Sequence, residues 1–166
     1  ALTKLKEENL INNFSKTKSL KAVILRFGTI FGISAGMRFH TAVNKFCWQA
    51  SMGIPITVWE TAYEQKRPYL DLLDASRAIV HIIEKDLFNG GTYNILTLNT
   101  TVKNIVNEIS RLKKDIKINF VKNKIMNQLS YEVSCEKFSR ENFTFKGDLR
   151  KGIRETISQL LQSDTI

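Results

Sequence analysis

The sequence predicts an α/β fold that lacks a complete dinucleotide-binding half, and one observation supports each part of this prediction. Short apolar runs typical of strands alternate along the chain with segments in which apolar residues recur at helical spacing. The 166 residues contain neither the Gly-x-Gly-x-x-Gly turn nor the later acidic residue that a complete dinucleotide-binding half requires. The chain is therefore expected to form one core with an α/β arrangement that is not a complete doubly wound domain.

The first 32 residues are expected to form one helix and one strand. Residues 2–14 are compatible with an amphipathic helix, because charged positions surround five apolar ones, Leu2, Leu5, Leu10, Ile11 and Phe14. A polar stretch, NNFSKTKS at 12–19, is expected to break this helix. The segment KAVILRFG at 21–28 is almost continuously apolar, which favours a strand buried on both faces of a parallel sheet.

The middle of the chain is expected to alternate helices with short strands. Residues 40–52 carry apolar side chains at helical spacing, and Gly53 with Pro55 is expected to end that helix. The segments ITVW and RPYLDL are typical of extended chain. Asp74 is expected to cap a further helix, which the glycine pair at 90–91 would terminate, and TYNIL then predicts a strand.

The last third of the chain gives the clearest helical signal. A helix beginning near Thr100 or Thr101 repeats apolar residues at helical spacing, at Val102, Ile105, Val106, Ile109 and Leu112. The segment IKINFV at 116–121 alternates apolar and polar residues, as a half-buried strand does. From Asp148 onward a final helix is expected, with apolar residues at Ile153, Ile157, Leu160 and Leu161.

Composition excludes a membrane-spanning protein and gives no support to a metal site. No apolar run approaches the roughly 20 residues that cross a bilayer. Cys47 and Cys135 form no Cys-x-x-Cys pair, and His40 and His81 stand far apart, so neither a disulfide framework nor a bound metal is expected. Isolated cysteines are typical of a reducing compartment, and a cytoplasmic protein is therefore expected.

The chain is basic, with a formal net charge of +9. A basic surface can serve a nucleic acid or an anionic small molecule, or reflect no binding at all. The densest stretch, RLKKDIKINFVKNK at 111–124, holds six basic residues and one acidic residue. A helix end and the solvated face of a strand account for most of it. Because no basic groove with interleaved aromatic residues accompanies it, nucleic-acid binding is not the favoured interpretation.

Read in order, these segments resemble the C-terminal half of an extended short-chain dehydrogenase/reductase, of the NAD-dependent nucleotide-sugar epimerase/dehydratase family. That family carries YxxxK, often continued as YxxSKxxxE, on a long helix. This chain begins ALTKLKEE, so Lys4 matches the family lysine and Thr3 the usual serine, and the tyrosine would immediately precede Ala1. LRFGTIFG at 25–32 is similar to the family's LRxxNxYG, with Thr29 where asparagine is common.

The longest match is GIPITVWETAYEQKRPYLDLLDASRAI at 53–79, which resembles GxPxxVxGxGxQxRxFxxVxDxAxA. Arg67 falls on the family arginine, whereas residues 59–62 stand where the family usually has a Gly-x-Gly turn. GGTYNILTLNTTVKNIVNEI is similar to GxxYNxGxxxxxSxxEL. The segment CEKFSRENFTFKGDLRKGIRETI resembles the family's tail, which Gly152 and Thr156 fit, although the usual proline is absent.

The resemblance implies the C-terminal part of a Rossmann-type fold with a small mixed α/β substrate-binding region, and with the N-terminal Rossmann half absent. Residues 1–32 would be the remainder of the Rossmann domain, namely the YxxxK helix without its tyrosine and a following parallel strand. Residues 33–166 would be mostly substrate-binding region, with 68–90 packing back on the Rossmann part.

The same resemblance assigns candidate catalytic and cofactor-binding residues. In the family the tyrosine acts as general acid and base toward a sugar hydroxyl, while the lysine lowers the tyrosine pKa and binds the nicotinamide ribose. Lys4 is therefore the candidate for both the catalytic and the cofactor-binding role. Phe27, Gly28 and Thr29 are the further candidates for contact with the cofactor.

Candidate substrate-binding residues follow from the family's grip on a nucleotide diphosphate. Arg67 is the main candidate, because a planar guanidinium can hold two oxygens of a diphosphate. Thr29, Arg38 and Asn44 are further candidates from the loop and helix start that family members place beside this group. His40 is expected to make only a local polar contact. Trp48 and Trp59 could stack on a base, although core positions are the expectation for both.

The resemblance implies NAD or NADP as the cofactor of the full-length protein, a nucleotide-diphosphate sugar as its substrate and a homodimer as its assembly. This chain by itself is expected to be catalytically inactive and to bind no cofactor tightly. A half-sheet would expose the edge of the KAVILRFG strand, so self-association or docking with the missing Rossmann half is expected. The alternative hypothesis is a non-catalytic module of related fold that binds a nucleotide or a nucleic acid through its positive charge.

Overall fold

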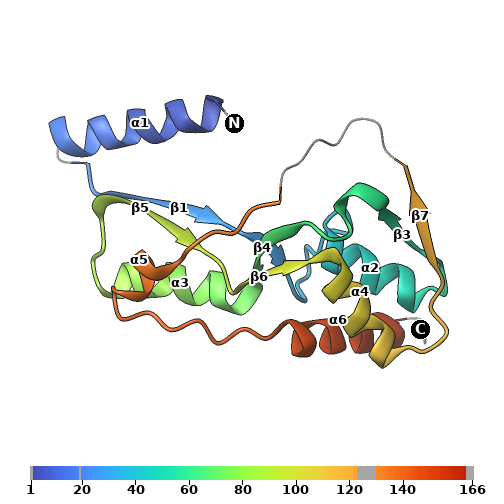
Figure 1. Cartoon of the computed structure of the whole chain (residues 1–166). Helices are drawn as coiled ribbons and strands as arrows, with labels where there is room; N and C mark the ends of the chain where they lie inside the picture. The colour runs from blue at the N-terminus through green and yellow to red at the C-terminus, as the bar shows by residue number, and fades with distance from the viewer. Residues whose placement is uncertain (1, 19, 123–129, 164–166) are drawn as a thin grey trace.

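The helices and strands gather at two ends of an elongated α/β arrangement (Figure 1). The computed structural model describes residues 2–18, 20–122 and 130–163. One end holds α1 (Leu2–Thr17), β1 (Ala22–Phe27), α3 (Leu72–Glu84), β5 (Asn89–Ile95) and α5 (Glu136–Ser139). The other end holds α2 (Ala42–Ser51), β3 (Ile56–Trp59), the 3-10 turn η1 (Glu60–Ala62), α4 (Val102–Leu112), β7 (Ile118–Val121) and α6 (Leu149–Ser163). Between them lie β2 (Thr29–Phe31), β4 (Lys66–Asp71) and β6 (Leu98–Thr101). The predicted α/β class is confirmed.

Three of the four strand pairings in the described residues are parallel. β1 pairs in parallel with β5, so that Leu25 lies beside Tyr93 and Phe27 beside Ile95. β2 pairs in parallel with β4, whose other edge pairs antiparallel with β6, and β3 pairs in parallel with β7. Each parallel pair is joined by a long connection that contains a helix, as parallel pairing requires.

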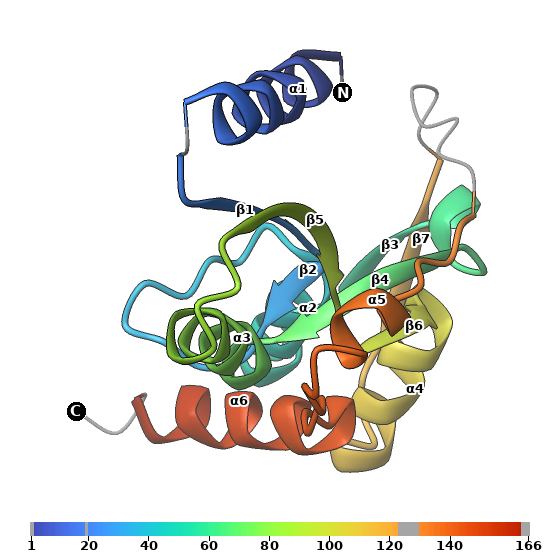
Figure 2. The same ribbon diagram turned by 90° about the vertical axis from the view of Figure 1, so that its left-hand side faces the viewer.

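β1 forms at the predicted position, but it is not buried on both faces. Within the part of the chain that the structure describes, β1 has a strand partner on one side only, and Ile24 is its one buried residue. Figure 2 shows α1 above the β1–β5 pair and α3 below it. The expected burial on both faces is therefore wrong for this chain, because no further strand extends the sheet on the side of β1.

Helix α1 is present as predicted, yet it continues to Thr17 through the polar stretch that was expected to break it. Polar residues are tolerated in a helix that has no buried face, and α1 has no buried residue. The Thr17 hydroxyl also donates to the carbonyl of Asn13 at 2.7 Å. Glu8 joins the helix to β1 by accepting a hydrogen bond from Nε of Arg26 at 2.8 Å.

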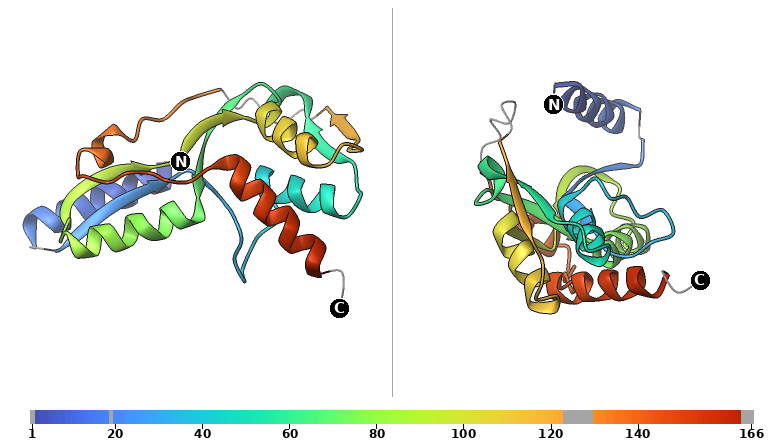
Figure 3. Two further views of the ribbon diagram at one scale, coloured as in Figure 1. Left: turned by 90° about the horizontal axis from the view of Figure 1, so that it is seen from below. Right: turned by 90° about the vertical axis from the view of Figure 1, so that its right-hand side faces the viewer.

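The larger hydrophobic core lies where α2, α4 and α6 meet the strands β2, β3 and β4. α6 packs on both α2 and α4, and Figure 3, left, shows it passing across α2. The predicted apolar faces of α2 and α4 point into this core, and Gly53 follows α2 with a φ of 67°, as the expected helix end requires. Its most buried side chains are Phe31, Val43, Cys47, Ile56, Val58, Ile105, Val106, Ile109 and Ile153.

A second core lies between α3, the β1–β5 pair and the last part of the chain. Residues 130–148, which we call the returning chain, pass through α5 and along α3 before they reach α6. The returning chain contributes Phe138 and Phe143, whose ring centroids are 4.8 Å apart, and Phe145 lies 4.9 Å from Phe143. These rings pack on Leu70, Ala78, Ile82, Tyr93 and Ile95.

Asp74 fixes the returning chain to α3. Its carboxylate accepts hydrogen bonds from the amides of Lys146 at 2.9 Å and Gly147 at 2.8 Å, from the Thr97 hydroxyl at 2.9 Å and from the Arg77 guanidinium at 2.7 Å. A Cβ added at Gly147 would lie 2.7 Å from an oxygen of Asp74, so this close approach requires glycine.

The capping role predicted for Asp74 belongs to Asp71. The Asp71 side chain accepts a hydrogen bond from the Leu73 amide at 2.8 Å, because β4 continues directly into a helix that begins at Leu72. The helix also ends earlier than predicted, at Glu84, and the glycine pair at 90–91 lies inside β5.

β7 occupies part of the predicted strand at 116–121, without the expected alternation of burial. Ile118, Asn119 and Phe120 are all exposed. This strand pairs only with β3, and a solvated edge leaves both of its faces accessible.

Two features are absent from the described residues. Across 2–18, 20–122 and 130–163, no helix combines the length and the apolar character needed to cross a membrane. The same ranges bring no three His, Cys, Asp or Glu side chains together in a group that could hold a metal ion.

Candidate functional site

A cavity of about 300 Å³ lies between β2, β3, β4 and the start of α2, and we call it the Arg67 pocket. Its walls come from six elements, β2, α2, β3, η1, β4 and α4, which the fold brings together from residues 29 to 102. The described residues that line it are Thr29, His40, Thr41, Ala42, Lys45, Phe46, Thr57, Val58, Trp59, Ala62, Gln65, Arg67, Tyr69 and Val102.

Strand register brings two of the predicted site residues together. Thr29 lies beside Tyr69 in the parallel pairing of β2 with β4. Arg67 precedes Tyr69 by two positions on β4, so both side chains project from the same face of the strand. Thr29 and Arg67 therefore reach the same cavity, which Tyr69 also lines.

The N-terminus of α2 forms another wall. Thr41 is the N-cap residue, and its side chain makes no capping hydrogen bond. Amide groups at a helix start carry partial positive charge and lack partners within the helix. Lys45 stands one turn further along α2 and lines the same cavity. Both features favour an anion at this wall.

The charges that line the Arg67 pocket have one sign. Of the described residues that line it, Lys45 and Arg67 are cationic and none is Asp or Glu. Each of the other four cavities described here includes at least one carboxylate, for example Glu84 or Glu132. A negatively charged ligand therefore fits the Arg67 pocket better than it fits the others.

The guanidinium of Arg67 is held by neighbours on and beside β4. One terminal nitrogen donates to the carbonyl of Lys66 at 3.0 Å, and the other donates to Oε1 of Gln65 at 2.8 Å. The Cζ atom of Arg67 lies over the ring of Tyr131, 4.8 Å from the ring centroid.

Two further side chains give the pocket its polar and aromatic character. Tyr69 is 3% exposed, and burial raises the pKa of its phenol to about 12, so the hydroxyl stays protonated and can donate a hydrogen bond. Trp59 is 42% exposed, which corrects the expectation of a core residue and leaves its ring accessible for stacking.

Cys47 belongs to the larger core and not to the lining of the pocket. Burial raises the pKa of its thiol to about 12, which makes this thiol a poor nucleophile.

Phe27 and Gly28 lie at a neighbouring cavity of about 410 Å³, which Tyr131 and Glu132 also line. A Cβ at Gly28 would lie 3.1 Å from the backbone of Pro68, so glycine permits the close approach of these two segments. The candidate cofactor contacts Phe27 and Gly28 thus stand apart from Thr29, which faces the Arg67 pocket.

Arg38 and Asn44 do not line the Arg67 pocket. Asn44 is buried, where its Oδ1 accepts from the Gly32 amide at 3.2 Å and its Nδ2 donates to the Arg38 carbonyl at 3.4 Å. This side chain therefore shapes the loop ahead of α2. Arg38 is an exposed residue of that loop.

Lys4 lies on α1, away from the Arg67 pocket. Its side chain is 80% exposed and its Nζ lies 2.6 Å from Oε2 of Glu7. The hydrogen bond to that carboxylate raises the pKa of Lys4. Lys4 lines none of the cavities described here, so the described residues do not bring it together with Arg67.

Sequence reasoning missed Lys45 and Tyr69. The alternation of β4 was a usable signal for Tyr69, because it stands two residues after Arg67. Lys45 follows the helix start by one turn, but only the fold shows that this start faces β4. His40, expected to make a local contact, lines the pocket beside Thr41.

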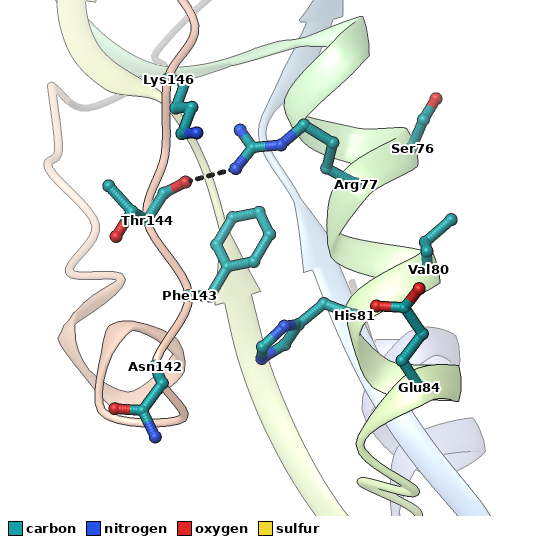
Figure 4. A pocket seen from close by; sticks show the side chains of 9 residues that line it. All are labelled: Ser76, Arg77, Val80, His81, Glu84, Asn142, Phe143, Thr144 and Lys146. Atoms are coloured by element: carbon teal, nitrogen blue, oxygen red, sulfur yellow. Dashed lines mark hydrogen bonds between the residues drawn. The ribbon is translucent and has the colours of Figure 1, made fainter.

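A larger cavity of about 490 Å³ lies between α3 and the returning chain (Figure 4). Arg77 and Lys146 are its lining cations. Arg77 is engaged by Asp74 and by the carbonyl of Thr144 at 2.9 Å, and its guanidinium lies 5.1 Å from the Phe143 ring centroid. Glu84 adds a negative charge to the lining. Size alone therefore does not make this cavity the better candidate for an anionic ligand.

Residues 1–95 match the model of the NAD-dependent epimerase/dehydratase family. Solved structures resemble nearly the whole chain. UDP-glucuronic acid 4-epimerase from Bacillus cereus, in complex with UDP-glucuronic acid and NAD, matches with a TM-score of 0.84 and 22% identity, over 98% of this chain and 52% of that chain. UDP-glucose 4-epimerase from Thermotoga maritima, with UDP-glucose, matches with a TM-score of 0.84 and 18% identity, over 98% and 53%.

A third structure, RMD from Pseudomonas aeruginosa complexed with NADPH, matches with a TM-score of 0.75 and 14% identity, over 98% of this chain and 55% of that chain. At these identities the likeness shows the fold alone. The present chain spans about half the length of the solved structures that it matches. Its fold is accordingly part of a Rossmann-type, extended short-chain dehydrogenase/reductase fold.

Proposed function

The chain belongs to the NAD-dependent epimerase/dehydratase family, and on that premise we propose that it is the substrate-binding portion of an enzyme that acts on nucleotide sugars. In this proposal the Arg67 pocket holds the nucleoside diphosphate of the substrate. The observation that supports it most is the pocket itself, where Arg67, Lys45 and the N-terminus of α2 converge and the described lining contains no carboxylate.

Each wall of the pocket has a distinct task in this proposal. The Arg67 guanidinium and the Lys45 ammonium bind diphosphate oxygens, and the start of α2 adds its amide groups. The protonated hydroxyl of Tyr69 and the hydroxyl of Thr29 supply neutral hydrogen bonds. The exposed ring of Trp59 offers a flat surface for the base.

The nicotinamide cofactor of the family would supply hydride transfer when bound. The described residues do not form a site for it, because Lys4 is exposed and does not line the cavity that holds Phe27 and Gly28, and the sequence has no Gly-rich phosphate turn. We therefore propose that this chain by itself binds neither NAD nor NADP tightly and is catalytically inactive. Lys4, Phe27 and Gly28 remain the candidates for cofactor contact in a whole enzyme.

The division of the chain and its assembly are further parts of the proposal. Residues 1–32 are assigned to the Rossmann part and residues 33–166 mostly to the substrate-binding region. The pairing of β1 with β5 supports the packing of 68–90 against the Rossmann part, and it extends that packing to Ile95.

The open edge of β1 and the exposed apolar residues of α1 support self-association, as in a homodimer. The isolated cysteines support a cytoplasmic setting.

No observation favours the alternative of a nucleic-acid-binding module. Two cations of the basic stretch at 111–124 make contacts within the chain. Arg111 pairs with Glu108, and the Nζ of Lys113 lies 3.3 Å from the carbonyl of Ser51. The end of that stretch, including Lys124, lies outside the described residues.

Titration of the chain with UDP by calorimetry tests the proposal. Arg67→Ala removes a charge-assisted contact to the diphosphate, and we expect it to weaken UDP binding about ten- to hundredfold. Arg140→Ala is the matched control, because Arg140 makes only a 3.8 Å surface pair with Glu136, and it should leave the affinity unchanged. With UDP-glucose and NAD in place of UDP, no product should form.

Three results would contradict parts of this proposal. Absence of UDP binding, or equal binding by Arg67→Ala, would remove the assigned substrate site. Binding of a short duplex DNA that weakens with salt, without a response to UDP, would favour the alternative module. Turnover of UDP-glucose would show that the isolated chain is active.

A further inference from the structure

Tyr131 lies against Arg67 without being part of either core. Its ring centroid is 4.8 Å from Cζ of Arg67, within the range of a cation–π contact. Tyr131 is 51% exposed, so burial of apolar surface does not explain its position. It also lies outside the lining of the Arg67 pocket, behind the guanidinium that the pocket uses.

The backbone around Tyr131 is fixed to β4 and β6. The Lys66 amide donates to Oγ of Ser130 at 2.9 Å, and the Tyr131 amide donates to the Lys66 carbonyl at 3.3 Å. Lys66 also pairs with Glu132 at 2.7 Å. These contacts set the register of the returning chain against the residue that precedes Arg67.

A second attachment follows two residues later. The Asn99 side chain donates to the carbonyl of Val133 at 2.9 Å and accepts from its amide at 3.0 Å. Asn99 lies beside Pro68 in the pairing of β6 with β4. Tyr131 is therefore anchored on both sides, and its ring has a defined place next to Arg67.

The Arg67 guanidinium contacts both hydrogen-bond acceptors and an aromatic ring. Lys66 and Gln65 accept hydrogen bonds from its terminal nitrogens, and its Cζ lies over the ring of Tyr131. An arginine side chain loses much rotamer freedom when it is held for a ligand. A ring that restrains the plane of the group before binding reduces that loss at the moment of binding.

We propose that Tyr131 is a positioning residue for Arg67, and that the returning chain thereby sets the affinity of the Arg67 pocket for a diphosphate. This inference rests on the proposed function, because it assigns Arg67 to the diphosphate. It adds a residue from the other end of the sequence, which acts through Arg67 and needs no contact with the ligand.

The test compares Tyr131→Leu, which removes the ring, with Tyr131→Phe, which keeps it, in calorimetric titrations with UDP and with uridine. We expect Tyr131→Leu to weaken UDP binding roughly two- to tenfold, Tyr131→Phe to retain it, and uridine binding to be unaffected by either change. In an Arg67→Ala background, Tyr131→Leu should have no further effect. Phe14→Leu, on the exposed face of α1, is the control for loss of an aromatic ring.

A second readout does not depend on ligand binding. The ring of Tyr131 should shift the NMR signal of the Arg67 Nε proton upfield, and this shift should persist in Tyr131→Phe and vanish in Tyr131→Leu. Loss of the same signal in Arg67→Lys assigns it.

The outcomes separate this inference from the proposed function. UDP binding that needs Arg67 but is unchanged in Tyr131→Leu would overturn the role of Tyr131 and leave the proposed function standing. Equal losses for UDP and uridine would also overturn it, because they would indicate general damage. Absence of UDP binding by the unmodified chain would overturn both, whatever the NMR signal shows.

Discussion

Asp74 is the residue on which the attachment of the returning chain depends most. Its side chain is 1% exposed and satisfies two backbone amides, a hydroxyl and a guanidinium. Removal of the carboxylate would take this acceptor from the part-buried amides of Lys146 and Gly147 and leave the Arg77 guanidinium without its ion pair. Leaving a polar group without a partner lowers the free energy of unfolding by more than a typical hydrogen bond adds to it.

We expect Asp74→Ala to lower the free energy of unfolding by about 2–4 kcal/mol, measured by urea denaturation. Glu64→Ala is the control: it removes an exposed carboxylate that pairs with Lys103 at 2.7 Å, and it should cost less than about 1 kcal/mol. Equal effects of the two changes would show that Asp74 does not fix the returning chain.

At this scale two residues singled out from the sequence lie together. Thr29 and Arg67 line one pocket, because β2 and β4 pair in parallel with Thr29 beside Tyr69. Their role toward a ligand stays a prediction. Lys45 and Tyr131 could not be predicted, since their positions depend on where α2 begins and on how the returning chain crosses β4. The family motif drew attention to Asn44, whereas this residue is buried in α2 and its side chain binds the loop that precedes the helix.

Among the elements, α1 is the least supported by the rest of the chain. It contributes no buried residue, whereas α4 buries Ile105, Val106 and Ile109. Helical propensity alone barely stabilises a helix of this length in water. The Glu8–Arg26 pair is partly exposed and adds little.

Amide hydrogen exchange followed by mass spectrometry should therefore find α1 opening most readily. We expect its amides to exchange at least about tenfold faster than those of α4 at low protein concentration. Protection of α1 that rises with concentration would indicate that a second copy covers it. Protection equal to that of α4 at every concentration would contradict the weak attachment described here.

The structure has two cores where the sequence predicted one, yet the helices that pack on the larger core were predictable from their apolar spacing. The predictions for α2, α4 and α6 are confirmed for this reason. Two predictions failed where the local signal was ambiguous. Asp71 and Asp74 are both capping residues by type, and the polar stretch before Thr17 is equally acceptable in an exposed helix.

At the scale of the whole molecule, β4 and the returning chain both connect the two ends. β4 runs from the Arg67 pocket to α3. The returning chain is the longer connection: it passes Arg67, crosses to the second core and comes back to α6. Tyr131 and Asp74 are the points at which this segment meets the site and the helix. The sequence did not indicate this path, because polar contacts that fix it, such as Lys66–Glu132 and Asp74–Gly147, join residues more than 60 positions apart.

The most direct test of the proposed diphosphate site is to map UDP binding by the backbone amide signals of the ¹⁵N-labelled chain. The largest changes should fall on Thr29, Lys45, Thr57 and Arg67, which line the Arg67 pocket. The amides of Arg77 and Lys146, at the larger cavity, should stay unchanged. Changes centred on Arg77 and Lys146, or no change at any site, would contradict the assignment of the Arg67 pocket to a nucleoside diphosphate.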